Sequence, residues 1–271
     1  MTEGSAHSPR PPRLCPRRIR LWAFCAALVV AGGCRGREFR EAEERLRVLA
    51  TRPRRLERPV VLVHGWLDGP RRFRKMIAHL ETCAPGSEKK IHCVSLDGSG
   101  PIDGLAERVA RECAPLGEVD VIAHSMGNLV ARQADGKHGL KIKRLFSLAG
   151  PHTGGRFAFL IHRVHDQVRD MDARSVFIRK LNSNSKSMDF KIVTFRVRGD
   201  PLVSRTSAHF VGSEHHELRR LLFRKAHKHL PQDERVIAYI LEALLTERPT
   251  GGTNAAADAL QKIKAAQEKK K

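Results

Sequence analysis

One short stretch constrains the fold of this 271-residue chain more than any other. Val119–Ala123 is an apolar run of strand character, and Asn128–Ala134 begins a segment of helical character. Between them, Ala123–Gly127 (AHSMG) has small residues two positions before and two positions after a serine. Larger side chains at those positions would collide with the neighbouring strand and helix. The pattern therefore predicts a sharp, strained strand-to-helix turn that exposes the Ser125 hydroxyl above a sheet.

Strand-like and helix-like segments alternate on both sides of this turn. Apolar runs predict strands over residues 60–63, 91–96, 119–123, 144–149 and 190–197, with a weaker candidate at 216–223. Helical spacing of apolar residues predicts helices over 70–82, 103–114 and 236–245, besides the one that begins at 128. Strands that alternate with helices form βαβ units, so we expect an α/β fold with a mostly parallel central sheet.

Composition divides the chain into one folded domain and polar ends. We expect the folded domain over residues 59–246, with residues 154–188, which lack strand character, as a small helical cap insertion. Residues 34–58 are charged, with helical spacing over 37–57 but no clear apolar stripe, which predicts an N-terminal anchor in the form of a stalk or an N-terminal helix. Residues 247–271 are rich in Thr, Gly, Ala and Lys and predict a flexible basic tail.

Residues 1–33 have the layout of a signal peptide. Arg17–Arg20 (RRIR) forms a positive n-region, and Leu21–Ala31 forms an apolar h-region too short to span a bilayer. Ala31–Gly33 then supplies the small residues that a signal peptidase requires. The layout predicts export from the cytoplasm.

Cys34 follows these small residues directly. Small residues that end on a cysteine after an h-region resemble the lipobox of bacterial lipoproteins. The resemblance implies cleavage before Cys34 and lipidation of its thiol. Arg35 and Gly36 do not resemble an inner-membrane retention signal, so we expect an outer-membrane anchor facing the periplasm. The alternative is an ordinary secretory signal, which would release a soluble periplasmic or secreted protein.

The formal net charge of +21 raises the question of an anionic partner. Residues 1–34 carry a net charge of +4, which leaves +17 for the rest of the chain. Such a charge favours nucleic acid, an anionic membrane surface or acidic polymers. The basic residues are spread along the sequence, without a helix-turn-helix, RNP-like or zinc-finger pattern. We interpret the charge as a solvated arginine-rich surface and expect no nucleic-acid partner.

Three cysteines follow the leader: Cys83, Cys93 and Cys113. One disulfide with one free thiol and three buried free thiols both fit this odd number in an exported protein, because pairing cannot be read from sequence. Their spacing is not a zinc signature, and the sequence predicts neither a metal nor a cofactor.

A second motif strengthens the first. Val60–Val63 is an apolar strand that continues into His64-Gly65-Trp66. This strand resembles the first core strand of the α/β-hydrolase superfamily, and the Ala-x-Ser-x-Gly turn resembles a subset of its bacterial lipases and esterases. The resemblance covers about residues 59–245 and implies the α/β-hydrolase fold, with Ser125 as the nucleophile. It also implies an oxyanion hole made by the backbone N–H groups of Trp66 and Met126, which are fixed before charge develops.

The resemblance assigns supporting roles to neighbouring residues. Gly65 is expected to allow a tight turn, and His64 to be a buried histidine with satisfied hydrogen bonds. We expect His64, Gly65, His124 and Gly127 to line the site. Gly150–Gly155 (GPHTGG) resembles a turn at the carboxyl edge of lipase sheets, where ligands bind, so we expect its His152 to line the site as well.

The acid and the base are also implied by the resemblance. Asp200 follows a strand in an Asp-x-x-Val pattern similar to the family's acid loop, where it would hold an imidazole in the required tautomer. In the family order, the base follows the acid. His227 has Leu230 three positions later and Val236 nine positions later, as in related lipases. His229 fits neither spacing and is the reserve candidate for the base.

Together these motifs imply a serine hydrolase, either a lipase or a carboxylesterase, that acts on esters such as acyl lipids. A thioesterase or amidase on the same fold remains an alternative. A catalytically inactive binding protein of the cell envelope is another, although the complete set of Ser125, Asp200 and His227 argues against it. Acyl chain length, head group and oligomeric state have no signal in the sequence.

Overall fold

The computed structural model describes residues 36–96, 100–155, 165–184, 188–219 and 226–246. The expected signal peptide, its Cys34 and the expected tail at 247–271 lie outside the described residues. So do 156–164 and 185–187 of the expected cap. Within the described ranges, no helix is both long and apolar enough to cross a membrane.

A six-stranded sheet with the strand order β2-β1-β3-β4-β5-β6 forms the centre of the domain. Every neighbouring pair of strands is parallel. Buried strands such as Val60–Val63 are apolar on both faces, because helices cover both sides of a parallel sheet. The expected α/β fold is confirmed. The strands are β1 (Val60–Val63), β2 (Ile91–Val94), β3 (Glu118–His124), β4 (Lys141–Leu148), β5 (Lys191–Val197) and β6 (Glu214–Leu218).

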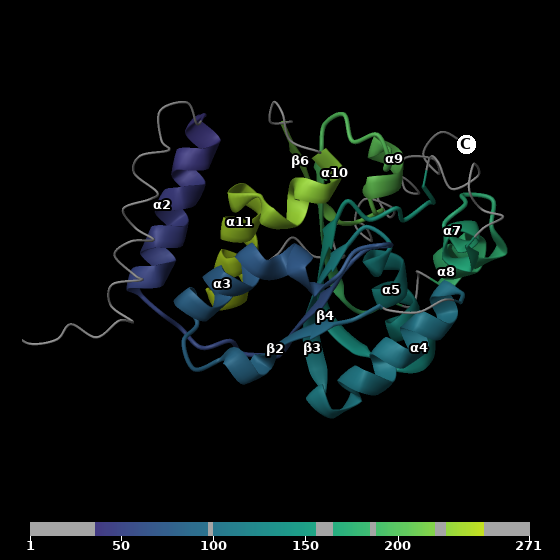
Figure 1. Cartoon of the computed structure of the whole chain (residues 1–271), viewed down its shortest axis with the longest axis horizontal. Coiled ribbons are helices and arrows are strands. Elements are labelled where there is room, and N and C mark those ends of the chain that lie inside the picture. The colour runs from purple at the N-terminus through teal and green to yellow at the C-terminus, as the bar shows by residue number, and fades with distance from the viewer. Residues whose placement is uncertain (1–35, 97–99, 156–164, 185–187, 220–225, 247–271) are drawn as a thin grey trace, which may run out of the picture. The chain divides into compact units, whose positions relative to one another are not determined.

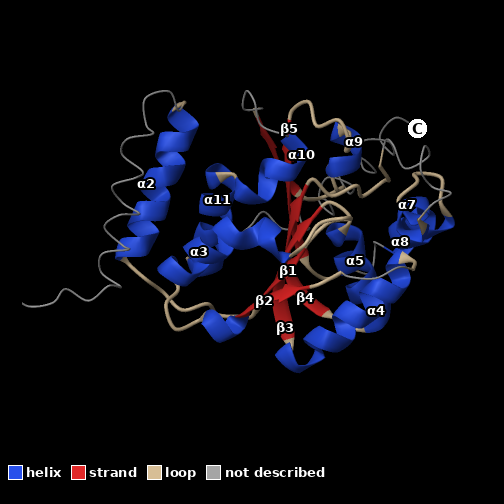
Figure 2. Ribbon diagram, viewed as in Figure 1, coloured by secondary structure: helices blue, strands red, loops and turns tan. Residues whose placement is uncertain are grey.

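Two helical layers flank the sheet (Figure 2). Helices α3 (Arg74–Cys83) and α11 (Glu234–Leu245) share one buried apolar cluster with the sheet. Helices α4 (Ile102–Cys113) and α5 (Gly127–His138) share a second cluster on the opposite face (Figure 1). The shorter elements are η2 (Pro70–Phe73), η3 (Glu88–Lys90), η4 (Ala114–Leu116), α7 (Asp166–Asp170), α8 (Val176–Ser183), α9 (Arg205–Ala208), α10 (Ala226–His229) and η6 (Leu230–Gln232).

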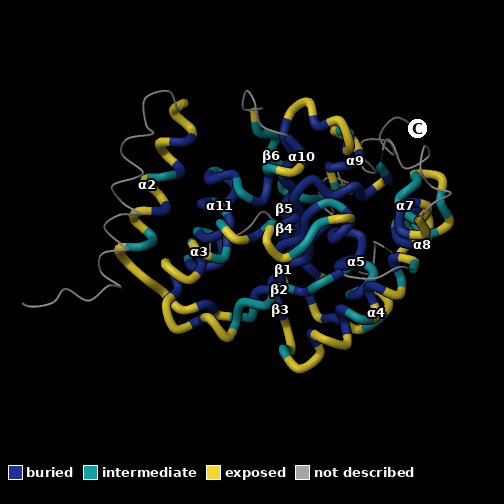
Figure 3. The backbone as a smooth tube through the Cα atoms, in the orientation of Figure 1, coloured by how far each residue is buried: buried dark blue, intermediate teal, exposed yellow. Residues whose placement is uncertain are grey.

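Of the two forms expected for the N-terminal segment, a stalk or a helix, the structure has a helix, and one part of it is packed. This helix is α2 (Arg37–Thr51). Ala42 and Leu46 are buried in the same cluster as Leu56 and the α3 and α11 side chains. Residues four apart lie on one helical face, so these two form a short apolar stripe. The stripe gives little periodic signal in the sequence because Arg and Glu residues surround it. Figure 3 shows this alternation of buried and exposed backbone along the helices.

Cys83, Cys93 and Cys113 are free thiols, as in the second of the two expected alternatives, and form no disulfide with one another. Cys83 lies on α3 and Cys113 on α4, which cover opposite faces of the sheet. Burial raises the pKa of each of the three thiols to about 11. They are therefore protonated at neutral pH and poor nucleophiles.

A buried ion pair links two neighbouring strands on the α11 side. The Arg144 Nε of β4 donates to Asp120 Oδ1 of β3 at 2.7 Å, and Asp120 is 1% exposed. Arg144 Nη1 also donates to the Ala243 carbonyl of α11 at 2.7 Å. The arginine thus ties the sheet to the helix that covers it.

Candidate active site

The turn between β3 and α5 has the strained conformation that its sequence predicts. Ser125 has a φ of 53°, in the left-handed region that residues other than glycine rarely adopt. Its N–H donates to the Leu148 carbonyl of β4 at 2.9 Å. The buried Asn128 amide nitrogen donates to the Ser125 and Ala123 carbonyls, each at 3.1 Å. These bonds from two sides fix the backbone on which the Ser125 hydroxyl stands.

The glycines of the site are required by close contacts. A Cβ on Gly127 would lie 2.5 Å from the Val63 carbonyl oxygen and 2.6 Å from that of His64, so only glycine allows α5 to begin against β1. A Cβ on Gly65 would lie 3.0 Å from Ser125 Cβ. Gly65 thus allows a close approach to Ser125, and a turn at Trp66 and Leu67 follows it, in which Leu67 has a φ of 50°.

Three side chains from separate segments meet at Ser125. His227 Nε2 lies 2.9 Å from Ser125 Oγ, and His227 Nδ1 lies 2.9 Å from Asp200 Oδ2. An ionised carboxylate only accepts hydrogen bonds, so Nδ1 carries the proton and Nε2 presents its lone pair to the serine hydroxyl. Asp200 follows β5, and His227 belongs to α10. The structure thus brings together the three residues that the sequence predicts to act together.

The Asp200 carboxylate is held by more than the histidine. Its Oδ1 accepts the backbone N–H groups of Leu202 at 2.9 Å and Val203 at 3.2 Å. Burial by itself raises the pKa of Asp200, but the hydrogen bond and charge of His227, together with these two N–H groups, bring the pKa below its ordinary value. Asp200 is therefore ionised at neutral pH and fixed in orientation.

Both expected oxyanion donors belong to segments that border Ser125. Met126 directly follows Ser125 and caps the N-terminus of α5. Trp66 follows Gly65, which packs against Ser125. Neither the Trp66 nor the Met126 amide donates a hydrogen bond to another residue in the described part of the chain. Free amides beside a helix N-terminus can bind developing negative charge.

Two of the expected lining histidines support loops of the site. His64 is buried, accepts the Leu96 N–H at Nε2 and contacts the Gly65 carbonyl through Nδ1, each at 2.9 Å. The expectation of a buried histidine with satisfied hydrogen bonds is confirmed. His124 is also buried, and its ring centroid lies 5.0 Å from that of His227.

The expectation that His152 lines the site is wrong. His152 is 1% exposed, and its Nε2 lies 2.9 Å from Ser147 Oγ. Its Nδ1 lies 3.5 Å from Nη1 of Arg132, a buried α5 residue that also donates to Asn182 Oδ1 at 2.9 Å. Its ring packs on Phe210. His152 therefore belongs to a buried polar network that connects α5 to α8.

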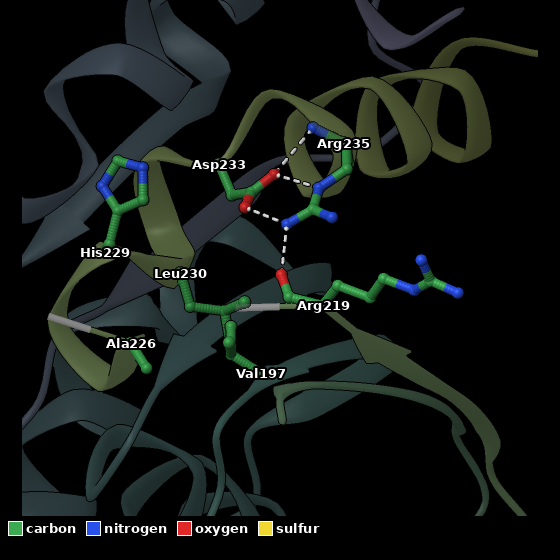
Figure 4. A pocket seen from close by; sticks show the side chains of 7 residues that line it. All are labelled: Val197, Arg219, Ala226, His229, Leu230, Asp233 and Arg235. Carbon is green, nitrogen blue, oxygen red and sulfur yellow. Dashed lines mark hydrogen bonds and ion pairs between the residues drawn. The ribbon is translucent and has the colours of Figure 1, made fainter. Parts of the chain in front are cut away.

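The reserve histidine has a different environment. His229 lines a small pocket (Figure 4), and no bond to Ser125 is found for it. His227 is therefore the histidine that the structure places against the serine. The other residues of that pocket are Val197, Arg219, Ala226, Leu230, Asp233 and Arg235.

Sequence reasoning missed the roles of two residues around the site, Asn128 and Arg72. Asn128 braces the Ser125 turn, and its only sequence signal is a polar residue in the first turn of a buried helix. Arg72 donates to the Lys228 carbonyl at 3.0 Å and also pairs with Asp68. Nothing in the sequence relates Arg72 to Lys228.

Among the described residues, no group of three or more His, Cys, Asp or Glu side chains is arranged to hold a metal ion.

Comparison with known proteins gives matches in structure but not in sequence. No protein-family model matches the chain, and no curated protein matches its sequence. The mature form of the Bacillus licheniformis lipase BlEst2 matches with a TM-score of 0.56 and 13% identity, over 71% of this chain and 94% of the lipase. The propeptide form of that lipase matches with a TM-score of 0.55 and 14% identity, over 74% of this chain and 52% of that one.

A third solved structure extends the comparison. A lipase-esterase related protein from Clostridium acetobutylicum matches with a TM-score of 0.50 and 14% identity, over 69% of this chain and 94% of that chain. At such identities the similarity concerns the fold alone. The parallel order of the strands, the helices on both faces and these matches agree that the chain has the α/β-hydrolase fold.

Proposed function

We propose that this protein is a serine esterase of the lipase type that cleaves carboxylic esters through Ser125, His227 and Asp200. The observation that carries the proposal is the pair of 2.9 Å contacts from His227, one to Ser125 Oγ and one to Asp200 Oδ2. A serine hydroxyl is a weak nucleophile until an adjacent base takes its proton, and this base is held in the required tautomer by a buried carboxylate.

The reaction follows from the positions of these groups. His227 Nε2 removes the proton from Ser125 Oγ as the oxygen attacks the ester carbonyl, and Asp200 stabilises the imidazolium that forms. The Trp66 and Met126 amides hold the negative oxygen of the tetrahedral intermediate. His227 then protonates the leaving alcohol, which departs and leaves an acyl group on Ser125. Water, deprotonated by His227, attacks this acyl-enzyme, and the acid and the free serine are released.

Acyl lipids are the substrate class that we propose. The matched solved structures include a lipase and a lipase-esterase related protein, although their likeness to this chain concerns the fold. The net charge of +17 beyond residues 1–34 favours an anionic lipid surface over a neutral one. A lipase would find its substrate at such a surface.

Covalent labelling tests the enzyme proposal first. A fluorophosphonate probe at neutral pH is expected to label the wild-type protein and not the Ser125→Ala variant. Absence of wild-type labelling, or labelling that survives Ser125→Ala, would refute the nucleophile. p-Nitrophenyl esters of increasing chain length then separate esterase from lipase behaviour. Matched acyl thioesters and anilides distinguish the thioesterase and amidase alternatives, because each shares the acyl group and differs only in the leaving group.

We also propose that the protein is exported and anchored in the outer membrane through lipidated Cys34. Two or more acyl chains on one cysteine give a stable anchor, whereas a single chain binds membranes only reversibly. Palmitate fed to cells is expected to label the wild-type protein and not the Cys34→Ala variant. Equal labelling of the two, or membrane fractionation that is unchanged in Cys34→Ala, would refute the anchor.

A further inference from the structure

The segment that carries His227 depends on hydrogen bonds from outside itself. Helix α10 has only four residues, so all of its carbonyl groups are among the last four of a helix, which lack partners within it. Two of these carbonyls accept side-chain donors from distant parts of the chain. His124 Nε2 lies 3.0 Å from the His227 oxygen, and Arg72 Nη1 donates to the Lys228 oxygen at 3.0 Å.

The histidine donor is set by chemistry and by burial. A carbonyl oxygen only accepts, so Nε2 of His124 must carry the ring proton. Burial, followed by the charge of His227, lowers the pKa of His124 to about 3, so that it stays neutral. Its Nδ1 has no hydrogen-bond partner in the described residues and lies 3.9 Å from Asp68 Oδ2. The bond to His227 is therefore the only one that the described structure gives to this buried ring.

The arginine donor connects two loops of the site. Asp68 lies two residues after Trp66, and its Oδ1 accepts Arg72 Nη2 at 3.0 Å. Arg72 uses its other terminal nitrogen for the Lys228 carbonyl. The planar guanidinium can serve both acceptors at once because its donors point in fixed, different directions. Arg72 thus joins the loop that supplies the Trp66 amide to the loop that supplies the base.

We propose that His124 and Arg72 are positioning residues that hold the backbone around His227 in register with Ser125 and the Trp66 amide. The proposal rests on the function proposed above. Since His124 is the neighbour of Ser125 in sequence, its bond fixes the base directly to the turn that carries the nucleophile. Arg72 fixes the same turn of α10 to the oxyanion loop.

A matched pair of substitutions tests His124. Gln places an amide nitrogen the same number of bonds from Cα as Nε2 of histidine, whereas Leu has similar bulk and no donor. His124→Leu is expected to lower kcat for a p-nitrophenyl ester roughly 10- to 100-fold, because a misplaced catalytic group costs up to about 100-fold. KM is expected to stay within about twofold, since substrate contacts are retained. His124→Gln is expected to recover most of the loss.

A second pair tests Arg72 and keeps the proposal testable if His124→Leu does not fold. Arg72→Met is expected to lower kcat on the order of tenfold, again without a matching rise in KM. Arg74→Met is the control, because Arg74 is an exposed arginine of the same segment with no bond to α10. Its kcat is expected to equal that of the wild type. Equal losses in Arg72→Met and Arg74→Met would refute the role of Arg72.

A proton NMR readout separates this proposal from the enzyme proposal. The proton on His227 Nδ1, which is donated in a hydrogen bond to Asp200, is expected to give a low-field signal that His227→Ala removes. In folded His124→Leu and Arg72→Met the signal is expected to broaden or vanish through exchange with water. If the signal and kcat are both unchanged in these variants, the positioning role is refuted. If the wild type hydrolyses no ester but shows the low-field signal, and the two variants lose it, the enzyme proposal fails and the positioning role stands.

Discussion

Replacing Asp200 by asparagine tests the hydrogen-bond geometry of the triad directly. Asp200 Oδ1 accepts two backbone N–H groups, from Leu202 and Val203, so only an oxygen can occupy that position. In Asp200→Asn the amide oxygen must therefore take the Oδ1 place, and the NH₂ group must face His227 Nδ1. Nδ1 becomes an acceptor, and the imidazole proton moves to Nε2. The base then presents a proton to Ser125 in place of a lone pair.

The magnitude follows from the loss of the base. An aspartate-to-asparagine change in the corresponding position of a serine protease triad lowers kcat about 10⁴-fold, which corresponds to about 5.5 kcal/mol of transition-state stabilisation. We expect a similar fall in kcat for p-nitrophenyl ester hydrolysis by Asp200→Asn. KM is expected to change little, because Asp200 is 4% exposed and faces His227. Fluorophosphonate labelling is expected to slow in parallel, since it requires the same activated serine.

A control at the other end of β5 makes the result interpretable. Asp189 is exposed and precedes β5, at the end of the strand opposite to Asp200. Asp189→Asn makes the same chemical change and is expected to leave kcat within about twofold of the wild type, as surface substitutions usually do. If folded Asp200→Asn retains more than about a tenth of wild-type kcat, the assigned tautomer is wrong and another group orients His227.

Three further predictions concern stability. Gly127→Ala places a Cβ within 2.6 Å of two backbone carbonyl oxygens at the end of β1. We expect it to lower the free energy of unfolding, measured by urea denaturation, by about 1–3 kcal/mol, and to lower the rate of ester hydrolysis as well. Asp120→Ala leaves the Arg144 guanidinium buried without its carboxylate partner and should lower the free energy of unfolding, measured with urea, by about 3–5 kcal/mol. The double substitution Asp120→Leu with Arg144→Met should restore much of that stability. The folded state keeps His124 neutral, whereas the unfolded chain protonates it below about pH 6.5. The free energy of unfolding therefore falls by up to about 1.4 kcal/mol per pH unit between pH 6.5 and 3, and His124→Gln should remove this pH dependence from urea denaturation curves.

The sequence predicted those parts of the site in which a local pattern and a backbone requirement coincide. The Ala123–Gly127 turn is such a case. A side chain at Gly127 would collide with backbone carbonyl oxygens at the end of β1, so a sequence that forms this turn needs glycine there. The order of strands and helices was predictable for a similar reason, since apolar runs and helical spacing reflect burial on two faces or on one. Asp200 and His227 came from spacing within a family resemblance, and the structure places both at Ser125.

The remaining features depend on contacts between residues far apart in sequence. Arg72 and Lys228 are 156 residues apart, and no local pattern marks an arginine that will donate to a distant carbonyl. His152 was misread because its position at the carboxyl edge of the sheet suggested exposure, whereas Ser147 and Arg132 enclose it. The stripe of α2 was missed because its few buried residues stand among charged ones and carry little periodic signal.

The two halves of the triad are supported in different ways. Ser125 stands on a strained backbone that is fixed by its own N–H, by the Asn128 side chain and by the close approach of Gly65. A strained residue persists only where its surroundings determine it more than once, so the nucleophile has little freedom to move. His227 stands on a single helical turn, two carbonyl groups of which accept hydrogen bonds from His124 and Arg72. Loss of geometry should therefore begin at the base and not at the nucleophile, and substitutions around α10 should lower kcat before they affect folding of the sheet.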